Sequence, residues 1–308
     1  MMKLITYLLM LFTALWTGGA AYAVTLSAHP VAENVYAIIG DTGMRTYQNE
    51  GMNANSGFVV TPAGVVVIDS GPTWLVAKEI HRVIKKVTKQ PVKFVVNTGG
   101  QDHRWLGNGY FKSIGAEIIA ARPALADMKA RGDMQLQGLR ESIRKKAAGT
   151  RPVYPDRFFE QSETLKLGGQ EIQLLYFHGG HTPGDSVVWL PQQGVLFSGD
   201  LVYVERMLGV LPISNTRDWL ASFAAMEKLE PRTIVPGHGR VCDLAMARRD
   251  ARDYLTLLRG HMKQALDQGA DLQTAITTLD QSAFKYLQHF DLLSGGNASR
   301  TYLEMESE

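Results

Sequence analysis

The sequence predicts an α/β fold in which two mixed β-sheets are sandwiched between helices. Short apolar runs rich in β-branched and aromatic residues, separated by Gly and Pro turns, occur in both halves of the chain and are typical of strands. Between two of these runs, Trp74 to Thr88 has apolar residues at helical spacing with basic residues between them. The C-terminal part is predominantly helical and amphipathic. This order of hairpins, βαβ unit, hairpins and helices suits two sheets in one domain.

The first half of the chain supplies one set of strands and two helices. Strands are expected at Val35 to Ile39, Ser56 to Val60, Val65 to Ile68, Val92 to Val96 and Ala116 to Ala120. The segment between the first two, Asp41 to Asn55, is polar and rich in Gly and Asn, so it is expected to be a loop. Helices are expected at Trp74 to Thr88 and at Gly109 to Ser113, with a loop from Asn97 to Asn108.

The second half begins with a helix rich in Lys and Arg, Pro123 to about Ala148, which we expect to lie solvated over a sheet. Arg151 to Glu163 carries two prolines and is expected to be irregular. Strands follow at Leu174 to Phe177, Ser186 to Leu190, Gly194 to Phe197 and around Ile234. Helices are expected at Asp218 to Leu229, which has an acidic residue in its first turn, and from Leu244 to about Leu287.

The first 23 residues are expected to be a cleavable signal peptide. Lys3 gives a positive start, Ile5 to Trp16 is apolar, and Ala21-Tyr22-Ala23 fits the rule of small residues at a cleavage site. The apolar run of about a dozen residues is short for a transmembrane span of about 20. We therefore expect residues 24–308 to form the mature domain with a helical C-terminal tail, exported to a bacterial periplasm, without stable membrane insertion after cleavage.

Composition excludes several classes of function. Hydrophobic residues make up 45% and charged residues 20%, which is typical of a globular protein with its own core. The formal net charge of +2 gives no reason to expect a nucleic-acid partner. Cys242 is the single cysteine, so an internal disulfide is excluded. A small-molecule substrate is the expected partner.

Histidines and an aspartate stand where three predicted strands end. The loop His178-Gly-Gly-His181-Thr-Pro-Gly-Asp185 follows one strand, Asp200 ends another behind Ser-Gly, and His238 follows Ile-Val-Pro-Gly. Neutral imidazole and carboxylate suit zinc and related divalent ions, and the neighbouring glycines allow a close backbone approach. The alternative is turn chemistry alone, because His-Thr-Pro-Gly also fits a β-turn. The coincidence at three strand ends favours a metal site.

These motifs resemble those of the metallo-β-lactamase fold superfamily. Its ordered motifs are matched by Asp69 in VVVIDSGP, His181 in HTPGD, Asp200 in LFSGD and His238 in PGHG. The resemblance runs from about Val35 to the C-terminus, and NASRTYLEME at positions 297–306 is similar to the exported, quinoprotein-linked zinc metallohydrolases beside the glyoxalase II-like branch. It implies a four-layer αββα sandwich with metal ions held at one edge of the two sheets.

The chain departs from the family at the first metal motif, His-x-His-x-Asp-His. Without a gap, its two leading histidines become Gly99 and Gln101, and its Asp-His pair becomes His103 and Arg104. Shifted by one residue, Asp102 and His103 fall on the Asp-His pair, but both leading histidines are still missing. In the shifted register the resemblance implies one complete site. In the gapless register Arg104 places a cation in the pocket, which opposes a divalent ion, and His103 is the one ligand from this loop.

The resemblance therefore implies one or two zinc ions, with iron or manganese as alternatives. The expected metal ligands are Asp102, His103, His181, Asp200 and His238. Asp102 and Asp200 are the expected catalytic residues, because either could orient a metal-activated water or return a proton to the leaving group. Further candidates are Gln101 and Asp69, the latter as a carboxylate that supports a ligand. On its Gly-Gly loop His178 could replace a missing imidazole, but a surface histidine is favoured. Trp105, Tyr203, Arg206 and Met207 flank the expected ligand loops, where each either lines a substrate pocket or packs as an ordinary rim residue.

Two functions follow as expectations. The first is an exported hydrolase that uses a metal-activated water on an ester, thioester or amide bond. The second is a non-catalytic or weakly metal-binding accessory protein of the same fold, with a periplasmic quinoprotein system as a partner. The missing histidines favour the second, and the complete HTPGD, SGD and PGHG series favours the first.

Overall fold

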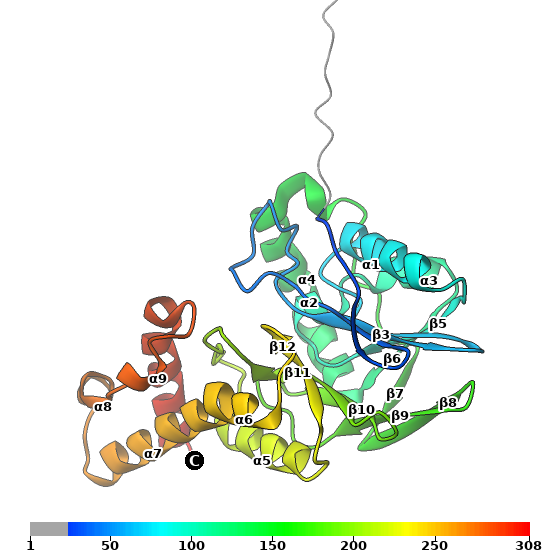
Figure 1. The fold of residues 1–308 in the computed structure, drawn as a ribbon. Helices are drawn as coiled ribbons and strands as arrows, with labels where there is room; N and C mark the ends of the chain where they lie inside the picture. The colour runs from blue at the N-terminus through cyan, green and yellow to red at the C-terminus, as the bar shows by residue number, and fades with distance from the viewer. Residues whose placement is uncertain (1–23) are drawn as a thin grey trace, which may run out of the picture.

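The computed structural model describes residues 24–308, and the predicted signal peptide, residues 1–23, lies outside the described residues. Two β-sheets face each other, and helices cover the outer side of each (Figure 1). The predicted αββα arrangement is confirmed. Among the described residues, every helix is too short or too polar to span a bilayer.

The first sheet has seven strands in simple sequence order. Its antiparallel part is a meander, and the pairs from β4 onward are parallel. The strands are β1 (His29–Ala32), β2 (Val35–Ile38), β3 (Ser56–Thr61), β4 (Gly64–Ile68), β5 (Val92–Asn97), β6 (Glu117–Ala121) and β7 (Arg157–Phe159).

The second sheet has five strands in the order β12-β11-β10-β9-β8. All of its pairs are antiparallel except β11 with β12, which run parallel. The strands are β8 (Ser162–Leu167), β9 (Gln170–Tyr176), β10 (Ser186–Leu190), β11 (Val195–Tyr203) and β12 (Thr233–His238).

Helices lie outside the sheets and at the C-terminal end. They are α1 (Trp74–Val87), α2 (Asp102–Trp105), α3 (Asn108–Ser113), α4 (Arg122–Ile143), α5 (Thr216–Glu227), α6 (Leu244–Ala247), α7 (Asp253–Asp267), α8 (Leu272–Thr278) and α9 (Phe290–Glu306). Short 3₁₀ segments occur at Arg144–Ala147 and Ser282–Phe284, and a π-helical turn at Arg248–Arg252.

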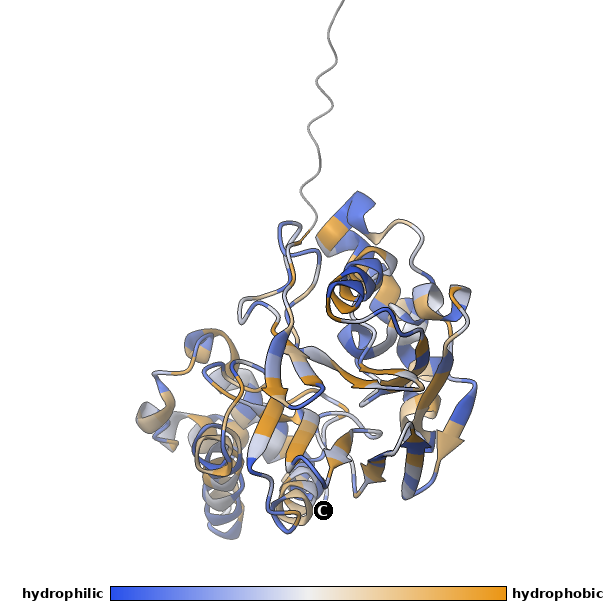
Figure 2. Ribbon diagram, turned by 45° about the vertical axis from the view of Figure 1, so that its right-hand side comes forward, coloured by the Kyte–Doolittle hydropathy of each residue, from blue (hydrophilic) through white to orange (hydrophobic). Residues whose placement is uncertain are grey.

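Strand alternation explains why the sheets stack as layers. Successive side chains of a strand point to opposite faces, so each central strand contributes side chains to two hydrophobic cores, one on either side of its sheet. In β4, Val65 and Val67 pack with α1, whereas Val66 and Ile68 face the second sheet. Figure 2 shows hydrophobic residues concentrated along the strands of both sheets. The outer face of the second sheet packs against α5 and α7.

Three segments differ from expectation. The segment 151–163, predicted to be irregular, contains β7 and the start of β8. Both are edge strands, and neither has an apolar run long enough for a strand to be predicted. The predicted 97–108 loop contains the four-residue helix α2, too short to show a period. A further helix, α9, follows the predicted helical tail, although Gly295 and Gly296 lower its intrinsic propensity.

Candidate metal centre

Three buried residues from three elements meet at one edge of the sheets. His103 lies in α2, Asp200 in β11 and His238 at the end of β12, and their ligand atoms all lie within 4.8 Å of one another. Strands β11 and β12 run parallel, with Tyr203 beside His238, so the ends of both strands reach the same edge. In the part of the chain that the structure describes, this is the one group of three or more such residues at metal-ligand spacing.

His238 presents a bare nitrogen to this group. Its Nδ1 lies 2.6 Å from the carbonyl oxygen of Asn53, so Nδ1 carries the proton and donates it. Burial holds the pKa of His238 well below that of a free imidazole, which keeps the ring neutral. Nε2 is then an unprotonated, buried nitrogen without a hydrogen-bond donor. It lies 3.2 Å from Asp200 Oδ1, where two lone pairs face each other unless a cation binds between them.

His103 lies between two carboxylates. Its Nε2 is 3.0 Å from Asp200 Oδ2, and its Nδ1 is 3.4 Å from Asp102 Oδ1. The T-shaped contact of its ring with His238, at 5.2 Å between centroids, brings the two imidazoles to one side of Asp200. Two imidazole nitrogens and one carboxylate oxygen make the set of three protein ligands that a catalytic zinc site uses, with a fourth position open.

Arg104 places a cation against the same two oxygens of Asp200 that His103 and His238 approach. Its charge therefore opposes a divalent ion there, while its hydrogen bonds orient the carboxylate. The guanidinium is fully buried and donates to both oxygens of Asp200, through Nε and Nη2. Each carboxylate oxygen has two lone-pair directions, so these bonds leave one direction free on each oxygen. An ion held by His103 and Asp200 would take the place of a proton between His103 Nε2 and Asp200 Oδ2. Gly237 makes this approach possible, because a Cβ at that position would lie 2.5 Å from Arg104 Nη2.

A second carboxylate completes the charge balance. Asp69 accepts from Arg104 Nη1 at 3.0 Å and from the backbone and hydroxyl of Thr98, both at 2.7 Å. It therefore lies behind Arg104 as a supporting carboxylate. Burial alone would raise the pKa of Asp200, but the charge of the Arg104 guanidinium, followed by contacts with His103 and His238, holds that pKa well below the usual range of an aspartate. Asp200 is thus ionised, as a metal ligand must be.

The remaining predicted residues divide into those near the group and those away from it. His181 is buried and lines the same cavity, and its Nδ1 donates to the Gly209 carbonyl at 2.8 Å. Gln101 lines the cavity as well, with its side chain toward Arg131. His178 is exposed and lies outside the cavity. His181 and Gln101 therefore border the three-ligand group without joining it.

Asp102 does not join the group either. Its Oδ1 accepts from Arg45 at 2.6 Å and from the backbone N–H of His103 at 2.8 Å. The helical turn of α2 sends consecutive side chains in different directions, so His103 and Arg104 reach Asp200 while Asp102 turns to Arg45. Asp102 is therefore a partner of Arg45 and a neighbour of His103, and it lies outside the three-ligand group.

This placement predicts different outcomes for two adjacent residues. Asp102→Ala is expected to lower metal affinity less than His103→Ala does, because the Asp102 carboxylate contacts the ligand His103 but is not in the ligand group itself. His103→Ala is expected to lower metal affinity by roughly 100-fold or more, because one of three ligands is lost. Titration of both variants with zinc in competition with a chromophoric chelator measures this. Equal losses of affinity would contradict the placement.

The group opens into a cavity of about 380 Å³. Of the four residues that flank the ligand loops, Tyr203 and Arg206 line this cavity, whereas Trp105 stacks on Tyr154 and Met207 lies in the core. Tyr203 stacks on the His238 ring at 4.4 Å and thereby holds the plane of that imidazole.

Arg206 is a buried cation with few partners. It is 7% exposed, and its Nη1 donates to the Gly43 carbonyl at 3.3 Å and lies 3.2 Å from His238 Nδ1. Its Nη2 lies 3.7 Å from Met44 Sδ, and its Nε has no partner. Within the described chain it forms no ion pair with a carboxylate. A buried guanidinium without an anion is costly, so the cavity suits a ligand that brings an anionic group.

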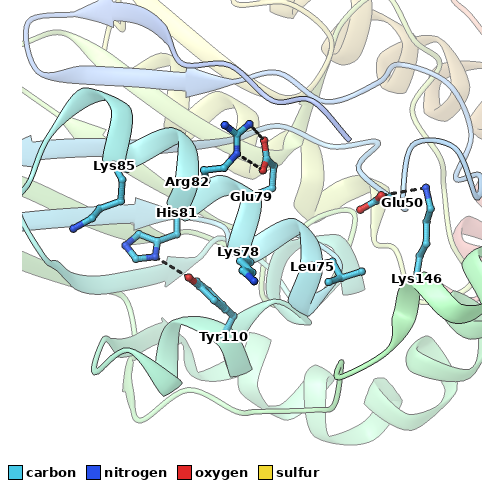
Figure 3. Close-up of a pocket in the computed structure, with 9 residues that line it drawn as sticks. All are labelled: Glu50, Leu75, Lys78, Glu79, His81, Arg82, Lys85, Tyr110 and Lys146. Atoms are coloured by element: carbon cyan, nitrogen blue, oxygen red, sulfur yellow. Dashed lines mark hydrogen bonds and ion pairs between the residues drawn. The ribbon is translucent and has the colours of Figure 1, made fainter. Parts of the chain in front are cut away.

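A larger groove of about 480 Å³ follows α1 and shares no lining residue with this cavity. Its carboxylates are neutralised by neighbouring cations, Glu79 by Arg82 and Glu50 by Lys146, and His81 bonds to Tyr110 (Figure 3). It contains no group of metal-ligand spacing in the described residues. The chemistry of the site therefore belongs to the smaller cavity.

Comparison with known proteins identifies the family. The profile of the metallo-beta-lactamase superfamily matches residues 49–238. The chain belongs to the metallo-β-lactamase superfamily. The matched range begins in the loop before β3 and ends at His238, the last residue of β12. It therefore contains all three residues of the ligand group.

Curated relatives of this superfamily member are hydrolases. A metallo-beta-lactamase type 2 of Elizabethkingia meningoseptica is 29% identical over 210 residues, which are 67% of this chain and 76% of the relative. One from Bacillus sp. (strain 170) is 26% identical over 71% of this chain and 78% of the relative. An acyl-coenzyme A thioesterase of Gallus gallus is 29% identical over 34% of this chain and 39% of the relative.

Solved structures show the same fold. A metallo-beta-lactamase from Pontibacter korlensis superposes with a TM-score of 0.59 at 24% identity, over 72% of this chain and 95% of that one. A double mutant of the sec-alkyl sulfatase PisA1 superposes with a TM-score of 0.72 at 16% identity, over 91% of this chain and 50% of the sulfatase.

Proposed function

We propose that this protein is an exported, metal-dependent hydrolase that holds a single divalent ion, zinc in the first place, on His103, Asp200 and His238. The unprotonated Nε2 of His238 carries the proposal, because a buried lone pair 3.2 Å from an ionised carboxylate calls for a cation. A second metal site, as the resemblance to the family implies, lacks its ligands here. Gly99 and Gln101 stand at the positions of the first two histidines of the family's metal motif. The scissile bond is an ester, thioester or amide.

When bound, the ion would polarise the scissile carbonyl and lower the pKa of water. Arg104 holds Asp200 in one orientation, so the ligand set is organised before the ion arrives. Burial lowers the pKa of His181 to about 4, so its ring is neutral near pH 7. Its proton lies on Nδ1, and Nε2 is free to accept a hydrogen bond from water or substrate.

Several observations support the choice of reaction. Relatives named as β-lactamases and as an acyl-coenzyme A thioesterase represent amide and thioester hydrolysis within one superfamily. The leader-like first 23 residues support export to a periplasm. The alternative, a binding protein without turnover that serves a quinoprotein system, is favoured by Gly99 and Gln101.

Arg206 predicts a preference for anionic substrates. Arg206→Met is expected to raise KM for a carboxylate-bearing ester by roughly 10–100-fold, since a charge-assisted hydrogen bond contributes about 1.5–3 kcal/mol. A neutral ester of the same shape should lose much less. Steady-state kinetics on the ester pair measures the difference, with Arg240→Met as the control, because Arg240 is exposed and outside the cavity. Equal changes in KM for both esters would argue against an anion site.

The reaction class is tested by turnover. The chain from residue 24 onward, loaded with zinc, is assayed on an ester, a thioester and a β-lactam and then stripped with a chelator. The proposal expects hydrolysis of at least one substrate that stops on chelation and returns with zinc. Stoichiometric zinc without turnover would favour the binding protein.

A further inference from the structure

The C-terminal helix α9 holds the loop that follows β11. Asn297 is fully buried, its Oδ1 accepts from the backbone N–H of Val210 at 2.8 Å, and its Nδ2 donates to the Leu208 carbonyl at 2.8 Å. One turn further along the helix, Arg300 Nη1 donates to the Val210 carbonyl at 2.6 Å. One carboxamide therefore brackets the residue between Leu208 and Val210.

That residue is Gly209, which lines the cavity and whose carbonyl accepts from His181 Nδ1 at 2.8 Å. The main chain of His181 is tied to the same loop, because Ser214 Oγ donates to the His181 carbonyl at 2.7 Å. Ser214 Oγ in turn accepts from the Leu211 N–H at 2.8 Å. The loop thus holds both the ring and the backbone of His181.

We infer that Asn297 is a positioning residue for His181. By binding the peptide groups on both sides of Gly209, Asn297 orients the Gly209 carbonyl toward Nδ1 of His181. This contact stabilises the His181 tautomer that is protonated on Nδ1 and unprotonated on Nε2. Without these hydrogen bonds the orientation of the Gly209 carbonyl would not be fixed, because glycine has the widest range of backbone conformations. The use of His181 in catalysis rests on the proposed function, but the link from Asn297 to the tautomer does not.

This inference also explains why polar residues recur in the tail. The Asn297–Glu306 segment contributes Asn297 and Arg300 to the loop, and Glu304 accepts from the Thr216 N–H at the start of α5 at 2.8 Å. These three residues bond to positions 208–217, from the loop after β11 to the first turn of α5. In the described chain, these bonds go to this wall of the cavity, and no side-chain hydrogen bond of the three residues goes to the three-ligand group.

The test compares Asn297→Leu with Thr301→Val. Asn297→Leu keeps the volume and removes both hydrogen bonds to the loop, together with a longer one to the Tyr254 hydroxyl at 3.4 Å. Thr301 is equally buried on α9, and its hydroxyl bonds only to the helix carbonyl of Asn297, so it reports the cost of disturbing the helix alone. Long-range ¹H–¹⁵N spectra of the metal-free protein identify the protonated nitrogen of His181 in each variant. Kinetics of the zinc-loaded protein give kcat and KM.

The wild type and Thr301→Val are expected to show His181 protonated on Nδ1 alone. Asn297→Leu is expected to show a mixture of tautomers and a kcat lower by roughly 10–100-fold with little change in KM, as for other groups that orient a functional histidine. A single Nδ1–H tautomer in Asn297→Leu would overturn the inference. A tautomer mixture in a protein without turnover would sustain it and defeat the proposed function instead. If Asn297→Leu does not fold, Asn297→Ala removes the same hydrogen bonds with a smaller side chain, and a single Nδ1–H tautomer there would overturn the inference.

Discussion

Replacement of His238 with alanine is expected to abolish stoichiometric metal binding and to lower kcat/KM by roughly 100-fold or more, because a three-ligand site becomes a two-ligand site. Its Nδ1–H bond to the Asn53 carbonyl orders the ring with Nε2 facing Asp200, so no other side chain can supply this nitrogen without rearrangement. Elemental analysis after dialysis and kinetics at saturating zinc measure the two effects.

His178→Ala is the matched control for His238→Ala. It removes an imidazole of the same size from an exposed position outside the cavity, so metal content and turnover should stay at wild-type values. Should His238→Ala keep the wild-type metal content while His178→Ala loses it, the ligand assignment is wrong.

Replacement of Arg104 with leucine is expected to lower the free energy of unfolding by about 3–5 kcal/mol at pH 7, the usual cost of removing one partner from a buried ion pair. The guanidinium is 1% exposed and bonds to Asp69 and Asp200, which both lie in the interior. Without it, two buried carboxylates lose their counter-charge. Chemical denaturation of the metal-free proteins measures the difference.

The loss in Arg104→Leu is also expected to depend on pH. Burial opposes ionisation of Asp200, but Arg104 and His103 hold its pKa well below the usual range. A depressed carboxylate pKa contributes stability that is present above the unfolded pKa of about 3.9 and is lost as pH falls through the folded pKa. The difference between wild type and Arg104→Leu should therefore be fully present near pH 7 and be lost mainly below about pH 4, as pH falls toward the depressed folded pKa of Asp200. A difference that stays constant below about pH 4 would show that packing, and not charge, is what Arg104 supplies.

Arg104→Lys separates charge from geometry in the same experiment. A lysine keeps the positive charge but cannot donate in a fork to both oxygens of Asp200. Its stability should lie between those of the wild type and Arg104→Leu. Its zinc affinity should fall if the orientation of Asp200 matters to the ligand set.

The positions of Asp200 and His238 could be read from the sequence, because a ligand at the end of a strand needs only the strand and its turn to be recognised. The αββα fold followed from the order of elements and from the motifs, and the structure confirms it. The fate of Asp102, His103 and Arg104 could not be decided in advance. A single turn of helix, α2, sets which of three adjacent side chains reach Asp200, and four residues carry no periodic signal.

The groups that determine the tautomers of His181 and His238 could not be predicted from the sequence, for a different reason. They are the main-chain carbonyls of Asn53 and Gly209, and every residue carries the same carbonyl, so no side-chain pattern marks them. Asn297 lies 88 residues after Gly209 in the chain. Its link to the cavity depends on how α9 docks, which local sequence does not encode.

The most direct test of a single-ion site is the metal content of the chain from residue 24 onward, purified without chelator and without a His tag and measured by elemental mass spectrometry. We expect one divalent ion per chain, and its loss in His238→Ala. Absence of metal after incubation with excess zinc would contradict the site and leave a binding protein of this fold. Two ions per chain would contradict the single-ion assignment and require a second metal site near His181.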